Sequence, residues 1–139
     1  MEPWYQRTFL WGQVNLTEDD PVRCDLSFWQ DYWKKTGVEG VIINCGGIVS
    51  YYRSRFSYQY KAQGLGEQDY FGLWNRAARE AGLTVIARMD INCTTKEMYD
   101  RYPEWYVPGQ GRAAHPESGK VYGLCERRLL PGVYSGSVP

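Results

Sequence analysis

The sequence predicts an α/β fold built from parallel (β/α) units, the first three units of a TIM-type barrel. Short apolar runs begin near residues 8, 41 and 83, and helical patterns separate them. Alternation of this kind indicates right-handed β-α-β crossovers and a parallel sheet. A complete barrel takes eight such units and about 250 residues, whereas this chain has 139 residues. The predicted barrel is therefore incomplete.

The bulk composition is that of a soluble globular chain with one domain at most. Hydrophobic residues make up 43% and charged residues 23%, with 16 basic and 16 acidic side chains. Because nucleic-acid and anionic-membrane binding depend on a basic surplus, zero net charge argues against both partners. The chain shows neither a signal-peptide pattern nor an apolar run of about 18 residues, so we expect a cytoplasmic protein.

The cysteines and the histidine predict neither a metal site nor a disulfide framework. Cys24, Cys45, Cys93 and Cys125 are widely separated, without a CxxC pair. His115 is the single histidine, and its polar surroundings favour an exposed loop position. We therefore expect no metal ligands and no cofactor.

The first strand is predicted at residues 7–16 and leads into Asn15. Asp20 followed by Pro21 predicts the start of a helix, since aspartate caps helices and proline suits the first helical position. Gly37 is predicted to end this helix. Its apolar stripe is Val22, Leu26, Trp29 and Trp33.

The second and third strands are predicted at residues 40–45 and 82–90, with a long loop and a helix between them. The second strand is apolar on both faces, so it is expected in the centre of a sheet. Asp69 is predicted to cap the intervening helix and Gly82 to end it. The third strand is expected to be a buried strand whose charged end carries the candidate site.

The last part of the chain is less regular. A short helix is predicted at residues 96–101, capped by Thr94 or Thr95. The segment that contains HPESGK is interpreted as a hairpin or an extended loop. Residues 1–125 are predicted to form the partial barrel, and residues 126–139 an irregular tail.

Charged and polar residues at the strand ends form the candidate site. Arg88 and Asp90 are two residues apart, so they lie on the same face of a strand. Parallel α/β folds place ligands at the carboxyl ends of their strands. The alternatives are an ion pair between Arg88 and Asp90, a capping role for Asp90, and a turn at Asn44 that only terminates its strand.

The loop at residues 46–68 interleaves aromatic and basic side chains. Aromatic residues between cations can stack nucleic-acid bases, but the chain has no net positive charge. A wall for a sugar pocket, or packing of the loop on itself, fits the composition better. The GLGEQD stretch within the chain lacks the third glycine of a dinucleotide fingerprint.

Three stretches carry a resemblance to a known family: GVIINCGGIVSYYRS, LGEQDYFGLWNRAAREAGLTVIARMD and YPEWYV. They resemble the amino-terminal part of the proteins described as hypothetical glycosyl hydrolase family 6, which are similar to α-L-fucosidase-like and β-galactosidase-like (β/α)8 barrels. The resemblance covers roughly residues 8–125.

The resemblance implies a glycoside hydrolase barrel of carbohydrate metabolism with its site at the strand carboxyl ends. The resemblance implies that Asn15 lies at this site and that the substrate is bound by Asn44, Tyr51, Tyr52, Arg88 and Asp90. Glycoside hydrolysis uses two carboxyl groups, and only Asp90 ends a predicted strand, so the catalytic residues stay unassigned. We expect the isolated chain to be an inactive fragment that takes a carbohydrate partner only in a completed barrel. The alternative is a noncatalytic binding or assembly module that completes its sheet by self-association.

Overall fold

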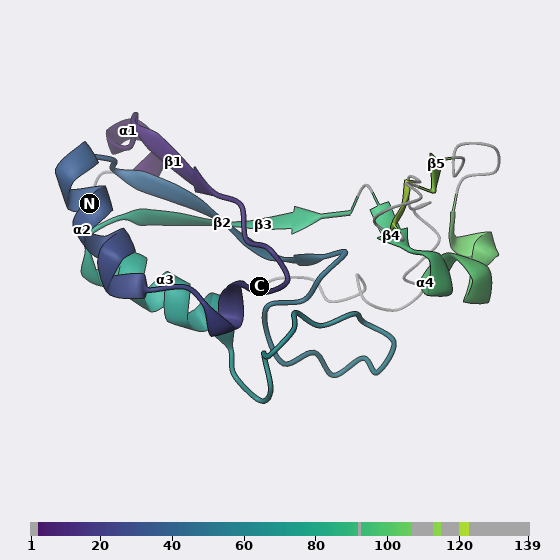
Figure 1. Cartoon of the computed structure of the whole chain (residues 1–139). Helices are drawn as coiled ribbons and strands as arrows, with labels where there is room; N and C mark the ends of the chain where they lie inside the picture. The colour runs from purple at the N-terminus through teal and green to yellow at the C-terminus, as the bar shows by residue number, and fades with distance from the viewer. Residues whose placement is uncertain (1–2, 92, 107–112, 115–119, 123–139) are drawn as a thin grey trace. The chain divides into compact units, whose positions relative to one another are not determined.

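The computed structural model describes residues 3–91, 93–106, 113–114 and 120–122. The chain divides into two compact units, Met1–Met89 and Asp90–Pro139. The first unit contains α1 (Trp4–Arg7), β1 (Trp11–Val14), the 3-10 turn η1 (Asp20–Val22), α2 (Leu26–Thr36), β2 (Gly40–Gly47), α3 (Tyr70–Glu80) and β3 (Thr84–Asp90), whose last residue belongs to the second unit (Figure 1).

The first unit confirms the predicted α/β class. Its three strands form one parallel sheet in the order β1-β2-β3, so β2 is central as predicted. Trp11 of β1 is paired with Gly40 of β2, and Val14 is paired with Ile43. Helices α2 and α3 connect the strands in sequence, which makes each connection a β-α-β crossover.

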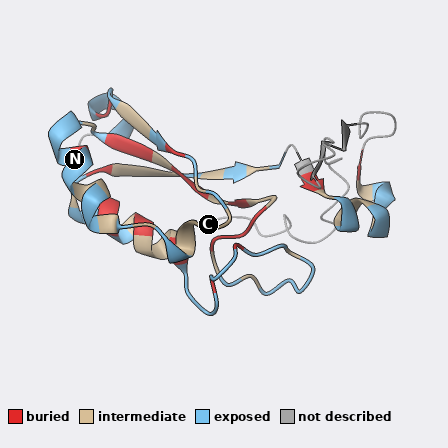
Figure 2. Cartoon of the chain, in the orientation of Figure 1, coloured by how far each residue is buried: buried red, intermediate tan, exposed pale blue. Residues whose placement is uncertain are grey.

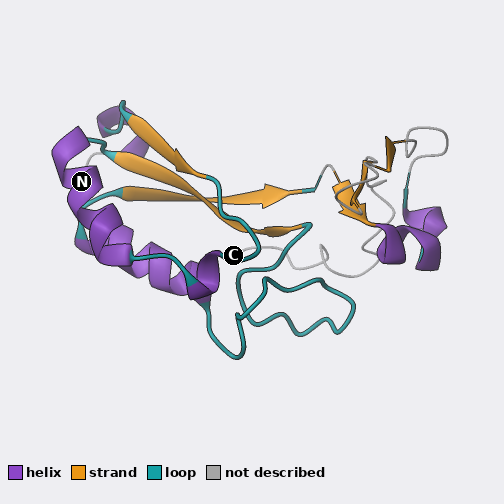
Figure 3. Cartoon of the chain, viewed as in Figure 1, coloured by secondary structure: helices purple, strands orange, loops and turns teal. Residues whose placement is uncertain are grey.

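The core lies between the sheet and its two long helices (Figures 2 and 3). Val41 and Ile43 alternate along β2 and are completely buried. The rings of Trp33 from α2 and Trp74 from α3 meet with centroids 5.9 Å apart. Because side chains alternate across a strand, this packing assigns the β2 positions in between, such as Ile42 and Asn44, to the opposite face of the sheet.

The start of α2 differs from the prediction. The helix begins at Leu26, and the carboxylate of Asp25 accepts hydrogen bonds from the amides of Ser27 and Phe28. Asp20 instead accepts from the amide of Thr17 and begins the short turn η1. Since its side chain is turned back along the chain, Asp20 is not the cap of α2.

The displaced start of α2 removes one residue from the predicted apolar stripe, whereas the predicted end of the helix is confirmed. Val22 lies in η1 and is 65% exposed, so it is not part of the buried face of α2. Gly37 ends α2 as predicted, with a φ of 66° that favours glycine.

The boundaries of α3 and β3 agree with the prediction, but the burial of β3 does not. Asp69 Oδ1 accepts a hydrogen bond of 2.8 Å from Gly72 N, and Gly82 follows the helix with a φ of 82°. Along β3, however, Ala87 and Met89 are exposed and the other positions are only half-buried. The expectation of a buried strand is wrong because β3 is an edge strand within the described sheet.

The second unit contains β4 (Cys93–Thr95), α4 (Lys96–Arg101), the turn η2 (Pro103–Trp105), β5 (Ala113–Ala114) and β6 (Lys120–Tyr122). Its strands form an antiparallel sheet in the order β4-β6-β5. Thr95, one of the two predicted capping residues, caps α4. Its Oγ1 accepts a hydrogen bond from Met98 N at 3.3 Å. The predictions for His115 and for the tail at residues 126–139 lie outside the described residues.

Within the described part of the chain, none of the helices combines the length and the apolar character required to cross a bilayer.

Candidate functional site

The candidate site lies on the face of the parallel sheet that α2 and α3 leave uncovered. Val41 and Ile43 of β2 point into the helical core, so Ile42 and Asn44 face the other way. On β1, Val14 belongs to the core, which places Gln13 on the same uncovered face as Asn44. In a (β/α) barrel this face is the interior of the barrel.

The amino-terminal end of this face is closely packed. A Cβ atom built on Gly40 would lie 2.5 Å from the Trp11 ring and 2.8 Å from the Thr8 methyl group. Thr8 Oγ1 also lies 3.0 Å from Thr84 Oγ1, across the sheet. The absence of a side chain at Gly40 therefore lets Trp11 cover the start of β2.

The carboxyl-terminal end of the face is polar, and three side chains are connected there by hydrogen bonds. Arg88 Nη1 donates to Asn15 Oδ1 at 2.9 Å. Gln13 Nε2 donates to the same oxygen at 2.7 Å. Because both donors bind one oxygen, the amide of Asn15 is fixed in orientation and its Nδ2 group is directed away from them.

Asn44 and Tyr51 hold the backbone that follows β1. Asn44 is buried, and its Oδ1 accepts from the Leu16 amide at 3.2 Å. The hydroxyl of Tyr51, which is also buried, donates to the Leu16 carbonyl at 2.8 Å. The second strand and its loop thus bind both the amide and the carbonyl group of Leu16, which positions the neighbouring Asn15.

Tyr52 lies against the end of β2. A Cβ atom on Gly46 would be 3.2 Å from the Tyr52 ring and 3.3 Å from the Met89 methyl group. Tyr52 is half-buried, so part of its ring remains accessible. Asp90 is half-buried, ends β3 and belongs to the second unit.

The structure thus brings Arg88 together with Asn15, and Asn44 together with Tyr51 through the backbone of Leu16. Gln13 is the participant that sequence reasoning missed. Its alternation with Trp11 on β1 was visible in the sequence, but a lone exposed glutamine carries no chemical signal. Its role follows only from the hydrogen bond to Asn15.

The long loop after β2 has a buried base and a more exposed tip. Ser50 is completely buried, and its backbone forms an isolated parallel β-bridge with Lys61. At the tip, the Phe56 and Tyr58 rings stack with centroids 5.4 Å apart, and the Arg55 guanidinium lies 5.0 Å from the centre of the Phe56 ring. Packing of the loop on itself therefore accounts for the Phe56 and Tyr58 pair, although both residues remain partly exposed.

Metal-binding geometry is absent from the described residues, where no three histidine, cysteine or acidic side chains gather as a metal site requires. In the first unit, the side chains of the candidate site are amides, the guanidinium of Arg88 and the phenols of Tyr51 and Tyr52. Such groups exchange hydrogen bonds with a ligand and orient it.

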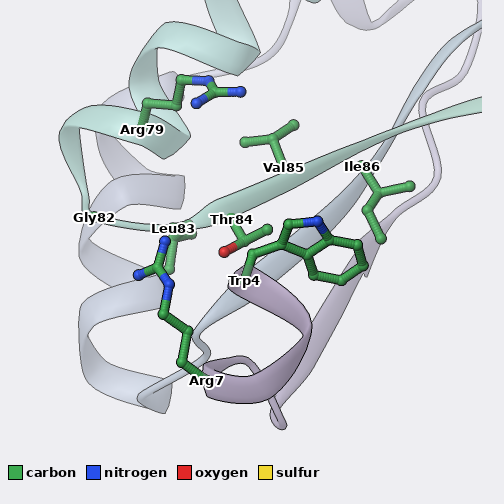
Figure 4. A pocket seen from close by; sticks show the side chains of 8 residues that line it. All are labelled: Trp4, Arg7, Arg79, Gly82, Leu83, Thr84, Val85 and Ile86. Atoms are coloured by element: carbon green, nitrogen blue, oxygen red, sulfur yellow. The ribbon is translucent and has the colours of Figure 1, made fainter. Parts of the chain in front are cut away.

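A separate cavity of about 410 Å³ lies at the amino-terminal end of β3. Figure 4 shows the Arg79 and Val85 side chains on one side of the β3 ribbon and the Trp4 and Arg7 side chains of α1 on the other. This cavity is at the opposite end of β3 from Arg88 and is distinct from the candidate site.

No protein-family model matches the chain, and neither a curated protein nor a solved structure does. The resemblance to the glycosyl hydrolase family stays a prediction.

Proposed function

We propose that this chain forms the first (β/α) units of a (β/α)8 barrel of the glycoside hydrolase type and supplies part of its carbohydrate-binding mouth. The observation that supports this most is that Gln13 and Arg88 both donate hydrogen bonds to Asn15 Oδ1 at the carboxyl ends of parallel strands. This end of the strands is where barrels bind their ligands. The further units would complete the sheet beyond β3.

The chemistry of this cluster suits a sugar hydroxyl. Asn15 Oδ1 is occupied by two donors, so Asn15 offers its two Nδ2 protons to a ligand. Gln13 uses its amide nitrogen within the cluster, which leaves its carbonyl oxygen as an acceptor. A hydroxyl group both donates and accepts hydrogen bonds, and it can therefore bind Asn15 and Gln13 together.

Hydrolysis by the isolated chain is not part of the proposal. A glycosidase uses a pair of carboxyl groups that flank the scissile bond. Asp90 is the carboxylate that terminates a described strand of the parallel sheet, and one carboxylate does not form the pair. Aryl fucosides and aryl galactosides should therefore remain intact, and hydrolysis that Asp90→Ala abolishes would contradict this part of the proposal.

The binding experiment is a titration of the natural chain with L-fucose, D-galactose and their methyl glycosides, followed by ligand-observed NMR. Asn15→Asp retains the acceptor oxygens for Gln13 and Arg88 but removes the Nδ2 donors. We expect it to weaken binding about fivefold, since one net hydrogen bond contributes about 1 kcal/mol.

The matched control is Asn75→Asp, because Asn75 Oδ1 accepts from Arg79 Nε at 3.0 Å on α3, away from the candidate site. This control should bind sugars as the natural chain does. An absence of sugar binding by the natural chain would contradict the proposed function. Equal binding by Asn15→Asp would remove Asn15 from the site.

The open sheet edges favour a second candidate function, a noncatalytic assembly module. In the described sheet, β1 and β3 each pair only with β2. Exposed edges of this kind readily accept another strand. This alternative predicts a stable oligomer in sedimentation experiments and no sugar binding by the separated chain.

We also propose a reducing, cytoplasmic location. Cys24 and Cys45 are free thiols, which supports this compartment because disulfides are rare there. Labelling of the chain in fractionated cells would test the location.

A further inference from the structure

The outer edge of β3 presents backbone groups to a further strand. The amide of Thr84 donates to the Glu39 carbonyl at 3.0 Å, on the side of β2. Because backbone groups alternate in direction along a strand, the amides of Val85 and Ala87 point away from β2. None of the strands in the described residues pairs with this edge.

The cavity at the start of β3 adds a charge preference to this edge. Its lining includes Arg7 at the end of α1 and Arg79 in the last turn of α3, and it includes no acidic residue. Arg79 Nε is bound to Asn75, which orients the guanidinium. In Figure 4 the two arginines flank the start of β3, with Arg79 on one side of its ribbon and Arg7 on the other.

The acidic residues next to these elements are engaged with other groups. The Glu39 carboxylate accepts from the amides of Phe9 and Leu10 at 2.6 and 3.1 Å. Glu80 accepts from Gln30 Nε2 at 3.5 Å. The charge of Arg7 and Arg79 is therefore not balanced by a carboxylate in the cavity lining.

We infer that the outer edge of β3 binds an extended segment that runs parallel to β3 and carries an acidic residue at its amino end. The direction is that of the sheet, since β1, β2 and β3 are parallel and purely parallel sheets are over-represented among sheets. A parallel segment begins beside the first residues of β3, where Arg7 and Arg79 meet its acidic side chain. The segment would occupy the edge that the further units of the proposed barrel extend, and the inference does not depend on carbohydrate binding.

Apolar surface along β3 completes the recognition. Val85 and Ile86 line the cavity and are half-buried. Met89, further along the strand, is 49% exposed. A segment with apolar residues after its acidic start would cover these side chains while its backbone pairs with β3.

The test uses a fluorescently labelled, acetylated peptide of about seven residues, a common strand length, with glutamate first and alternating valine and threonine after it. Binding to the full chain is measured by anisotropy. Arg7→Gln and Arg79→Gln should each weaken binding about threefold, since both side chains are exposed and an exposed ion pair contributes modestly. Arg76→Gln, an exposed arginine of α3 that does not line the cavity, should leave it unchanged.

Peptide variants test direction and charge separately. A lysine in the first position should weaken binding to the natural chain, and the Arg7→Glu and Arg79→Glu double variant should prefer that lysine peptide. A peptide with the glutamate moved to its carboxyl end should bind more weakly than the original. Equal binding of all three peptides to the natural chain would overturn the inference.

A sedimentation measurement identifies a competing occupant. The natural chain should be monomeric at the concentration of the peptide titration. A dimer that the glutamate peptide fails to dissociate would assign the edge to a second copy and overturn the inference. Tryptophan fluorescence of each variant verifies that loss of binding does not come from loss of the fold.

Discussion

Arg88 of β3 donates a hydrogen bond to Asn15 Oδ1 at 2.9 Å, although 73 positions separate the two residues in the sequence. The bond links the two outer strands of the parallel sheet across the end of β2. Gln13 donates to the same oxygen. Asn15 is thus the centre of the polar cluster at the strand ends, and its amide group has one defined orientation.

Substitutions of Asn15 should separate its acceptor from its donor role. Asn15→Ala removes the acceptor oxygen, and we expect the free energy of unfolding to fall by about 0.5–1 kcal/mol, the net contribution of an exposed hydrogen bond. Asn15→Asp retains the acceptor and faces Arg88, so it should be at least as stable as the natural chain. Urea denaturation measures both values, and a larger loss for Asn15→Asp than for Asn15→Ala would contradict the geometry.

Gly40→Ala should destabilise the fold through a steric clash. The added methyl group would lie 2.5 Å from Trp11 Cζ3, and overpacking of this kind costs about 1–3 kcal/mol. Gly12→Ala on the neighbouring strand is the control, because its nearest contact is 3.7 Å, to Val38 Cγ1. Thermal unfolding should show a clear loss for the first variant only, and a similar loss in both would mean that Trp11 does not cover Gly40.

Glu39 should make the fold sensitive to acid. Hydrogen bonds from the amides of Phe9 and Leu10 lower the pKa of its carboxyl group from the ordinary value of 4.5. A lowered pKa in the folded state stabilises the protein above pH 4.5 and less as the pH falls below it. Urea denaturation between neutral and acidic pH should show this loss, and Glu39→Gln should reduce it.

The control for Glu39 is Glu97→Gln, which lies in α4 of the second unit. This variant should follow the pH dependence of the natural chain. If Glu39→Gln also follows it without change, the hydrogen bonds to Phe9 and Leu10 do not contribute to the acid response.

Cys45 should react slowly with alkylating reagents in the folded chain. Burial raises the pKa of its thiol above the ordinary value of 9.0, and the nearby Asp69 carboxylate raises it further. Because the thiolate is the reactive form, iodoacetamide should modify Cys45 more slowly at pH 8 than in the urea-unfolded chain.

Asp69→Asn tests the electrostatic part of this effect, since asparagine also caps helices but carries no charge. Peptide mass mapping should show faster alkylation of Cys45 in this variant than in the natural chain. Equal rates in the folded and unfolded natural chain would show that Cys45 is not shielded.

The prediction from sequence succeeded where the cause is local. Asp69, Gly37 and Gly82 mark helix ends because a capping carboxylate or a left-handed glycine acts on its own neighbours in the chain. The start of α2 was misplaced because Asp20 and Asp25 carry the same side chain. Only the conformation of the backbone decides which of them reaches the helix amides.

Local sequence signals could not predict the degree of burial of β3 or the hydrogen-bonded cluster around Asn15. The apolar residues of β3 predict a buried strand, but burial depends on which strands and helices lie beside it. The role of Gln13 depends on a hydrogen bond to Asn15, and exposed amides carry no periodic signal.

The sequence by itself determined the α/β class, the order of strands and helices from β1 to β3 and the ends of α3, since alternation, helical spacing and caps act over a few residues. The tertiary structure decided that Arg88 meets Asn15, that Tyr51 and Asn44 hold Leu16, and that β3 is an open edge. These contacts join residues far apart in the chain. Their geometry exists only after the strands have paired and the helices have covered one face of the sheet.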